Sequence, residues 1–108
     1  MGGIIHVVQL RFKPDVNKDK IGQVIADLKS LKGKCILPDT QEPYIKSITA
    51  GADNSVEGLQ NGFTHMIVTV FESAKHRNYN AKSDPVHLAL GGGLGPVLEG
   101  LQVLDIDA

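Results

Sequence analysis

Tryptophan is absent from the chain and other aromatic side chains are few, with three phenylalanines and two tyrosines. Apolar residues nevertheless make up 42% of the 108 residues, so the core must consist mainly of isoleucine, leucine and valine. The single cysteine, Cys35, excludes an internal disulfide and with it a disulfide-stabilised secreted scaffold. We interpret it as a small apolar side chain rather than a nucleophile. Length and composition predict one domain over residues 1–108.

An excess of either charge is also missing, because 11 lysines and arginines face 12 acidic residues without a basic or acidic cluster. Electrostatic binding of nucleic acid or of an anionic membrane therefore has no support. The apolar run at 4–12 is too short for a signal peptide or a membrane span, so we expect a soluble cytoplasmic protein. The glycine run at 91–95 lacks the ending of a phosphate-binding loop. With no metal or nucleotide motif either, we expect no cofactor.

The first half of the chain predicts a strand, a helix and a second strand. Residues 4–12 are rich in β-branched side chains and end before Pro14, which is typical of a strand. Apolar residues then recur at helical spacing over 17–33, with Asn17 as the N-cap and Gly33 as the C-terminal stop. A second alternating strand is expected at 44–51, and its pattern groups Tyr44 with Ile48.

The second half predicts two more strands around an interrupted helical region. The strand at 63–71 is apolar on both faces, so we expect it in the centre of a sheet. Ser73 can cap a short helix. Asp84 and Pro85 suit the N-cap and first position of another, which the glycines from 91 stop. The last strand is expected at 101–106.

This order, β-α-β-β-α-β with the second helix split, predicts an α+β ferredoxin-like fold with a four-stranded antiparallel sheet. Helices then cover one face of the sheet only. The strands carry apolar residues on both faces, and no further segment remains to cover the second one. A homodimer in which two sheets face each other, a dimeric α+β barrel, would bury that surface.

Three stretches in this order resemble the stress-responsive A/B barrel domain family: IIHVVQLRFKPDV at the start, GFTHMIVTVFES in the middle, and DPVH followed by the closing VLDID. The resemblance covers residues 4 to 107 and implies a dimeric α+β barrel. Each motif is weak alone, whereas their joint order and spacing are specific.

A branch of this family, that of plant olivetolic acid cyclase, closes linear polyketides by an intramolecular aldol condensation. The resemblance to it implies four site residues: His6, His65, Tyr79 and His87. Two departures stand out, since Asp84 replaces the first histidine of an HPxH motif, and the spacer from Tyr79 to the proline is two residues longer.

Such chemistry needs a base to remove a proton beside a carbonyl and a donor for the oxyanion that forms. Histidine, with an ordinary pKa of about 6.5, suits the base. A small-molecule enzyme acting on an apolar or aromatic carbonyl compound is thus the first hypothesis. A non-catalytic stress-response protein whose histidines pack in the core, a small-ligand carrier and, more remotely, a haem-degrading monooxygenase remain open alternatives.

Overall fold

The computed structural model describes residues 2–108, in which four strands and three helices follow one another along the chain. The strands are β1 (Ile4–Phe12), β2 (Ile45–Ala52), β3 (His65–Phe71) and β4 (Leu98–Asp107). The helices are α1 (Lys18–Lys34), α2 (Ala74–Lys82) and α3 (Pro85–Gly92). The predicted α+β ferredoxin-like order is confirmed, including the split of the second helical region into α2 and α3.

All four strands form one antiparallel sheet in the order β2-β3-β1-β4. β3 is therefore central, as its two apolar faces predicted. Its register with β1 sets His6 opposite Thr69 and Leu10 opposite His65. Directly opposed residues in an antiparallel pair point to the same face, so the register decides which side chains of β1 and β3 meet.

The caps predicted for the helices are confirmed. The side chain of Asn17 accepts from the backbone N–H of Lys20, and Ser73 accepts from that of His76. The end of α1 differs from the prediction, because the helix passes through Gly33 and is capped at Cys35, whose N–H donates to the carbonyl of Leu31. Leu31 and Cys35 are both buried, and their packing on either side of Gly33 keeps that last turn helical.

β1 has the predicted bounds, those of the other strands differ from the prediction by at most three residues, and β2 contains an irregularity. The register with β3 shifts between Ile45 and Ser47. Strict alternation had placed Ile45 on the face opposite Ile48, but the shift brings both residues to the helix-covered face. Such a bulge cannot be seen in a period-two pattern, because the pattern assumes regular pleating.

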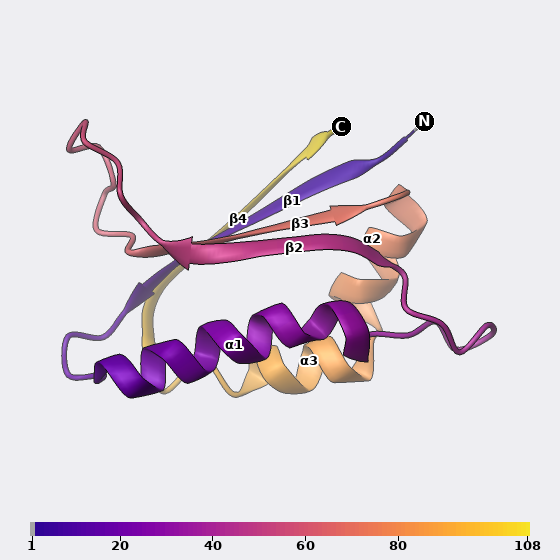
Figure 1. Ribbon diagram of the computed structural model, residues 1–108, viewed down its shortest axis with the longest axis horizontal. Coiled ribbons are helices and arrows are strands. Elements are labelled where there is room, and N and C mark those ends of the chain that lie inside the picture. The colour runs from indigo at the N-terminus through magenta and orange to yellow at the C-terminus, as the bar shows by residue number, and fades with distance from the viewer. Residues whose placement is uncertain (1) are drawn as a thin grey trace.

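The helices lie on one face of the sheet, with α1 and α3 side by side below it and α2 at the end near the two termini (Figure 1). The core fills the space between these layers, and Leu10 and Phe71 are among its fully buried side chains. None of the helices within residues 2–108 is both long and apolar enough to cross a membrane.

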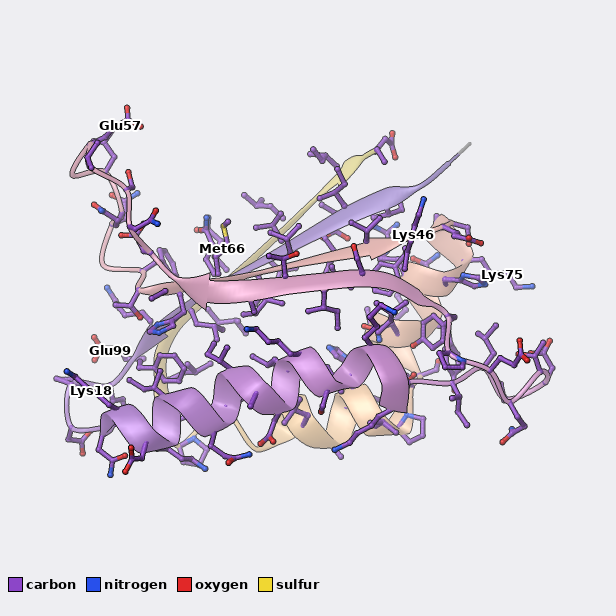
Figure 2. All side chains as sticks on the ribbon, in the orientation of Figure 1. Lys18, Lys46, Glu57, Met66, Lys75 and Glu99 are labelled. Carbon is purple, nitrogen blue, oxygen red and sulfur yellow. The ribbon has the colours of Figure 1, made fainter. Side chains whose placement is uncertain are left out.

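The opposite face of the sheet carries no helix, and Met66 and Lys46 project from it in Figure 2. Strand register places a set of apolar side chains there: Ile5, Val7, Val68, Val70, Leu104 and Ile106. Leu104 and Ile106 are 59% and 62% exposed. This uncovered face is the apolar surface that the sequence predicted.

Candidate functional site

A cavity of about 620 Å³ lies between the helix-covered face of the sheet and helices α1 and α3. Most of its wall is aliphatic, built from β1, β2, β3 and β4 and closed by leucines of the helices. Five polar side chains line it as well: His6, Thr69, Asn80, His87 and Glu99. An apolar cavity with a few polar groups is the usual form of a small-molecule site.

All of these polar groups except Glu99 gather at one end of the cavity, whereas Glu99 lies near Arg11 at the other. His6 and Thr69 are directly opposed on β1 and β3. Further along β1, Val8 and Leu10 line the cavity, and Leu10 lies four residues from His6, roughly 13 Å in an extended strand. The cavity thus has a polar end near His6, and its remainder is aliphatic apart from the exposed Glu99.

His6 is held by a chain of charged groups at the edge of the sheet. Its Nδ1 lies 2.7 Å from Oδ1 of Asp105, the residue opposite it on β4. The second carboxylate oxygen of Asp105 accepts from Nη1 of Arg77 on α2, also at 2.7 Å. Because the carboxylate of Asp105 accepts a hydrogen bond from Nδ1 of His6, this contact fixes the ring and leaves Nε2 for a ligand.

His87 reaches the cavity from the first turn of α3. Burial lowers the pKa of its imidazole, and the nearby His6 lowers it further, while Asp84 and the backbone of Asn80 act in the opposite direction. Its Nδ1 is buried without a hydrogen-bond partner. Burial thus favours the neutral imidazole, which is the form a general base needs.

Beside the polar end lies a second cluster, in which Asp84 is only 1% exposed. Its carboxylate accepts from the hydroxyl of Tyr44 at 2.5 Å and from the backbone N–H of Val86 at 2.9 Å. Asn80 donates to the same Tyr44 hydroxyl at 3.0 Å, so the cluster is linked to the cavity wall. Burial, with the help of Asp84, raises the pKa of Cys35 to about 12, so this thiol stays protonated.

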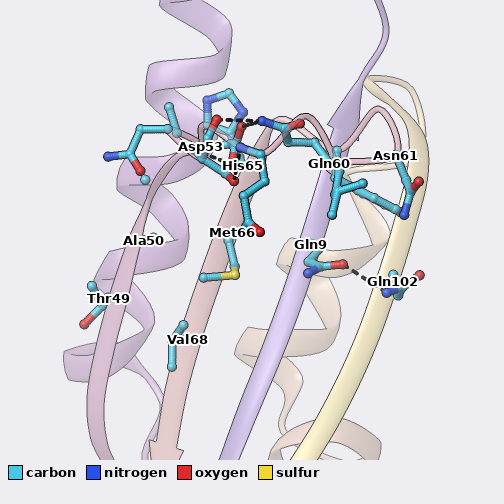
Figure 3. Close-up of a pocket in the computed structure, with 17 residues that line it drawn as sticks. Gln9, Thr49, Ala50, Asp53, Gln60, Asn61, His65, Met66, Val68 and Gln102 are labelled. Carbon is cyan, nitrogen blue, oxygen red and sulfur yellow. Dashed lines mark hydrogen bonds between the residues drawn. The ribbon is translucent and has the colours of Figure 1, made fainter.

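His65, a predicted site residue, does not line this cavity. β1 and β3 do pair, but the register sets His65 opposite Leu10, at the far end from His6. Its ring packs edge-on against Phe12, with centroids 5.1 Å apart, and burial lowers its pKa. It instead borders a hollow of about 610 Å³ beneath the β2–β3 loop, where Gln9 and Gln102 are hydrogen-bonded (Figure 3).

Tyr79, the other predicted residue, also lies outside the cavity lining. Its ring packs edge-on against Tyr44 with centroids 5.6 Å apart. The structure thus brings His6 and His87 together and leaves His65 and Tyr79 apart from them. It adds Asp105, which sequence reasoning missed, although alternation along the last strand places it on the face of Leu101 and Val103.

No sequence pattern pointed to a role in the site for Tyr44, Asn80 or Arg77, because their contacts there are with residues far away along the chain. In residues 2–108, no group of three or more histidine, cysteine or acidic side chains is placed to hold a metal ion.

Comparison with known proteins gives one family and several relatives. The model of the Stress responsive A/B Barrel Domain matches residues 4–108. The stress-response A/B barrel domain-containing protein HS1 of Arabidopsis thaliana is 36% identical over 72 residues, which are 67% of this chain and 60% of that protein. The match thus spans less than two thirds of that relative's length.

Solved structures share the fold over almost the whole chain. The hydroxynitrile lyase from Passiflora edulis has a TM-score of 0.84 and 27% identity, covering 99% of this chain and 94% of its own. An Arabidopsis thaliana protein follows with a TM-score of 0.80 and 28% identity, at 97% and 94% coverage. A dimeric ferredoxin-like protein from Thermobifida fusca, at 23% identity, TM-score 0.74 and coverages of 100% and 93%, supports the fold alone.

Proposed function

The chain belongs to the Stress responsive A/B Barrel Domain family, and from that premise we propose that it is a cofactor-independent acid–base enzyme. It makes or breaks a carbon–carbon bond beside the oxygen-bearing carbon of a small apolar carbonyl compound. The observation that carries the proposal is the pair of histidines at the polar end of the 620 Å³ cavity, one with a buried Nδ1 that has no hydrogen-bond partner and one held by a carboxylate.

In this proposal His87 is the general base. In the aldol direction its neutral imidazole takes the proton from the carbon next to one carbonyl, and the electron pair left on that carbon forms the bond to the carbon of a second carbonyl group. The C=O π bond of that second group opens to an alkoxide, which takes the proton back from His87. In the cleavage direction the imidazole takes the proton from a hydroxyl, and the electron pair of the broken bond stays on the departing carbon. Both directions move one proton and need no redox partner. A base with a lowered pKa stays unprotonated at a lower pH than an ordinary histidine does.

His6 is the oxygen-stabilising group in the same step. With Nδ1 engaged by Asp105, its Nε2 is free to donate to the carbonyl or alkoxide oxygen when the ring is protonated. Asp105 balances the positive charge on the ring, as a carboxylate does behind many catalytic histidines. Thr69, opposite His6 and lining the cavity, adds a hydroxyl at the same end.

The similarity to the hydroxynitrile lyase from Passiflora edulis supports this proposal, because cleavage of a hydroxynitrile breaks a carbon–carbon bond of this kind. The aliphatic wall supports an apolar substrate, and the volume falls within the usual range of small-molecule sites, about 300–1,000 Å³. His65 and Tyr79 receive no substrate contact in this proposal, although the family resemblance points to them.

The test is a paired assay with an aromatic hydroxynitrile, read by aldehyde release, and a linear polyketone, read by ring closure. We expect turnover of at least one, with a loss of at least about 100-fold in His87→Gln, the scale of general-base catalysis. His65→Gln and His76→Gln serve as histidine controls that lie outside the cavity lining. Equal loss in His65→Gln, or full turnover by His87→Gln, would place the chemistry elsewhere.

Binding of an unchanged aromatic aldehyde without turnover of either substrate would overturn the enzyme proposal in favour of a carrier. The cavity would then bind the ligand without converting it. Calorimetric titration of the aldehyde against the wild-type protein distinguishes these outcomes.

We further propose that the uncovered face of the sheet packs against a second copy of this chain. Its apolar side chains have no cover from residues 2–108, and exposed apolar surface of this extent is costly in water. Solved structures that share the fold and are described as dimeric lend support at the level of architecture.

Sedimentation at micromolar concentration tests this dimer. Leu104→Glu, on the uncovered face, should dissociate it, because the partner would bury an unpaired charge. The matched control is Leu88→Glu on α3, since Leu88 is also exposed but lies away from that face. A wild-type protein that sediments as a folded monomer refutes the dimer.

A further inference from the structure

The carboxylate of Asp84 is buried, and its hydrogen-bond partners are neutral. It accepts from the hydroxyl of Tyr44 at 2.5 Å, from the backbone N–H of Val86 at 2.9 Å, and at 3.5 Å from that of His87. The ion pairs formed within residues 2–108 do not include it. A buried carboxylate without a cation is costly, and a helix cap alone needs only a neutral oxygen. An aspartate at this buried position therefore calls for a further role.

We propose that Asp84 and Tyr44 form a positioning pair for His87: the carboxylate anchors the first turn of α3 and faces the imidazole with negative charge, while the tyrosine hydroxyl holds the carboxylate. Asp84 is then a positioning residue, because it acts through His87 and does not line the cavity. The pair explains why an aspartate, and not a neutral cap, stands at this position. It deepens the proposed function but can be tested without it.

The surroundings of His87 make Asp84 the main source of negative charge near the ring. From β1, His6 faces it. Asp105 on β4 is engaged by both His6 and Arg77, so its charge is compensated. Glu99 lines the cavity but is exposed, so water screens it.

The remaining elements around the ring bring no charge. Helix α1 contributes Leu28 and Leu31 to the cavity, and β2 and β3 contribute isoleucines and Thr69. The pKa of His87 is lowered by burial and by His6, and Asp84 opposes that change.

The other groups of the cluster around Asp84 are neutral hydrogen-bond donors. Asn80 donates to the hydroxyl of Tyr44 at 3.0 Å and contacts the sulfur of Cys35 at 3.8 Å. With a pKa raised to about 12, the Cys35 thiol keeps its proton as a donor beside Asp84. Tyr44 is held as a donor in the same way, because burial and Asp84 raise the pKa of its hydroxyl.

The experiment compares the titration of His87 in the wild-type protein and in Asp84→Asn, followed by the ring proton signals in NMR. Asparagine is as good an N-cap as aspartate, so the helix start is kept and only the charge is lost. We expect the midpoint of His87 to fall by about 0.5–1 pH unit, the lower end of what a nearby opposite charge contributes. A midpoint unchanged within about 0.2 unit would overturn the proposal, since a purely structural cap predicts no shift.

Two further variants sharpen the result. Asp105→Asn removes a charge of the same sign that faces His6, so the midpoint of His87 should move less than in Asp84→Asn. If Asp84→Asn does not fold, Asp84→Ser supplies another neutral cap and the same downward shift is expected. No shift in the folded serine variant contradicts the pairing equally.

The titration and the activity can fail separately. If the chain turns over a carbonyl substrate, the acidic limb of kcat/KM should move to lower pH in Asp84→Asn, by the amount seen in the titration. If no substrate is turned over and the titration still shifts, the enzyme proposal fails and the positioning pair stands. If activity is present and neither the limb nor the titration moves, the positioning pair fails alone.

Discussion

Two aspartates lie behind the two histidines of the cavity, and they are stabilised in different ways. Asp105 is 20% exposed at its side chain and pairs with His6 and with Arg77. Asp84 is 1% exposed and relies on Tyr44 and on backbone N–H groups. Asp105 is balanced by oppositely charged groups near water, whereas Asp84 is stabilised by hydrogen-bond donors in the protein interior. Removing a partner should therefore cost far more at Asp84.

The largest effect is expected from Asp84→Ala. It removes the cap of α3 and leaves the hydroxyl of Tyr44 buried without its acceptor. The free energy of unfolding should fall by about 3 kcal/mol, the sum of a lost cap and an unsatisfied buried group. Urea denaturation at constant protein concentration measures it. A loss below about 1 kcal/mol would mean that the hydrogen bonds of Asp84 contribute little to stability.

Tyr44→Phe should come next. The ring keeps its stacking with Phe71, whereas the carboxylate of Asp84 loses a hydroxyl donor and Asn80 loses an acceptor. We expect a loss of about 1–2 kcal/mol in the same assay. Tyr79→Phe is the matched control, because it removes a tyrosine hydroxyl outside these hydrogen bonds. Equal losses of stability in both variants would mean that the Tyr44 hydroxyl contributes no more than the Tyr79 hydroxyl.

Asp105→Asn should have a small effect on stability, at most about 1 kcal/mol, because the ion pairs it breaks are partly exposed. Raising the salt concentration should shrink this difference, as it does for charges near water. The cost of Asp84→Ala should stay nearly constant with salt. Opposite salt dependences in the two variants would reverse the comparison.

The smallest effect is the pH dependence contributed by His87. Its folded pKa lies below the ordinary value of about 6.5, so the unfolded state takes up a proton first as pH falls. The stability is complete above pH 6.5 and declines as pH falls through that value towards the folded pKa. His65 acts in the same direction. Urea midpoints between pH 7.5 and 5 should decline less in His87→Gln; an identical decline refutes this contribution.

Helix starts and the order of elements were predictable because their signals are local. Asn17, Ser73 and Asp84 each cap the helix that follows, and a cap depends only on the next three residues. The alternation of β3 likewise predicted its central place. The end of α1 and the irregularity in β2 escaped, since packing of neighbouring elements decided both.

The candidate site was predictable only in part. His6 and His87 line one cavity, as the family pattern implied, but His65 points to the other end because the register sets it opposite Leu10. A shift of register by even numbers of residues keeps the same face, so alternation alone cannot say which residues meet.

The amino-acid sequence by itself determined the elements, their order, the family and the apolar second face, since periodicity, caps and composition act within short stretches. Only the tertiary structure decided that Asp105 lies beside His6, that Tyr44 closes over Asp84, and that two of the four proposed residues stand apart. Those contacts join positions tens of residues distant, and strand register and helix docking create them.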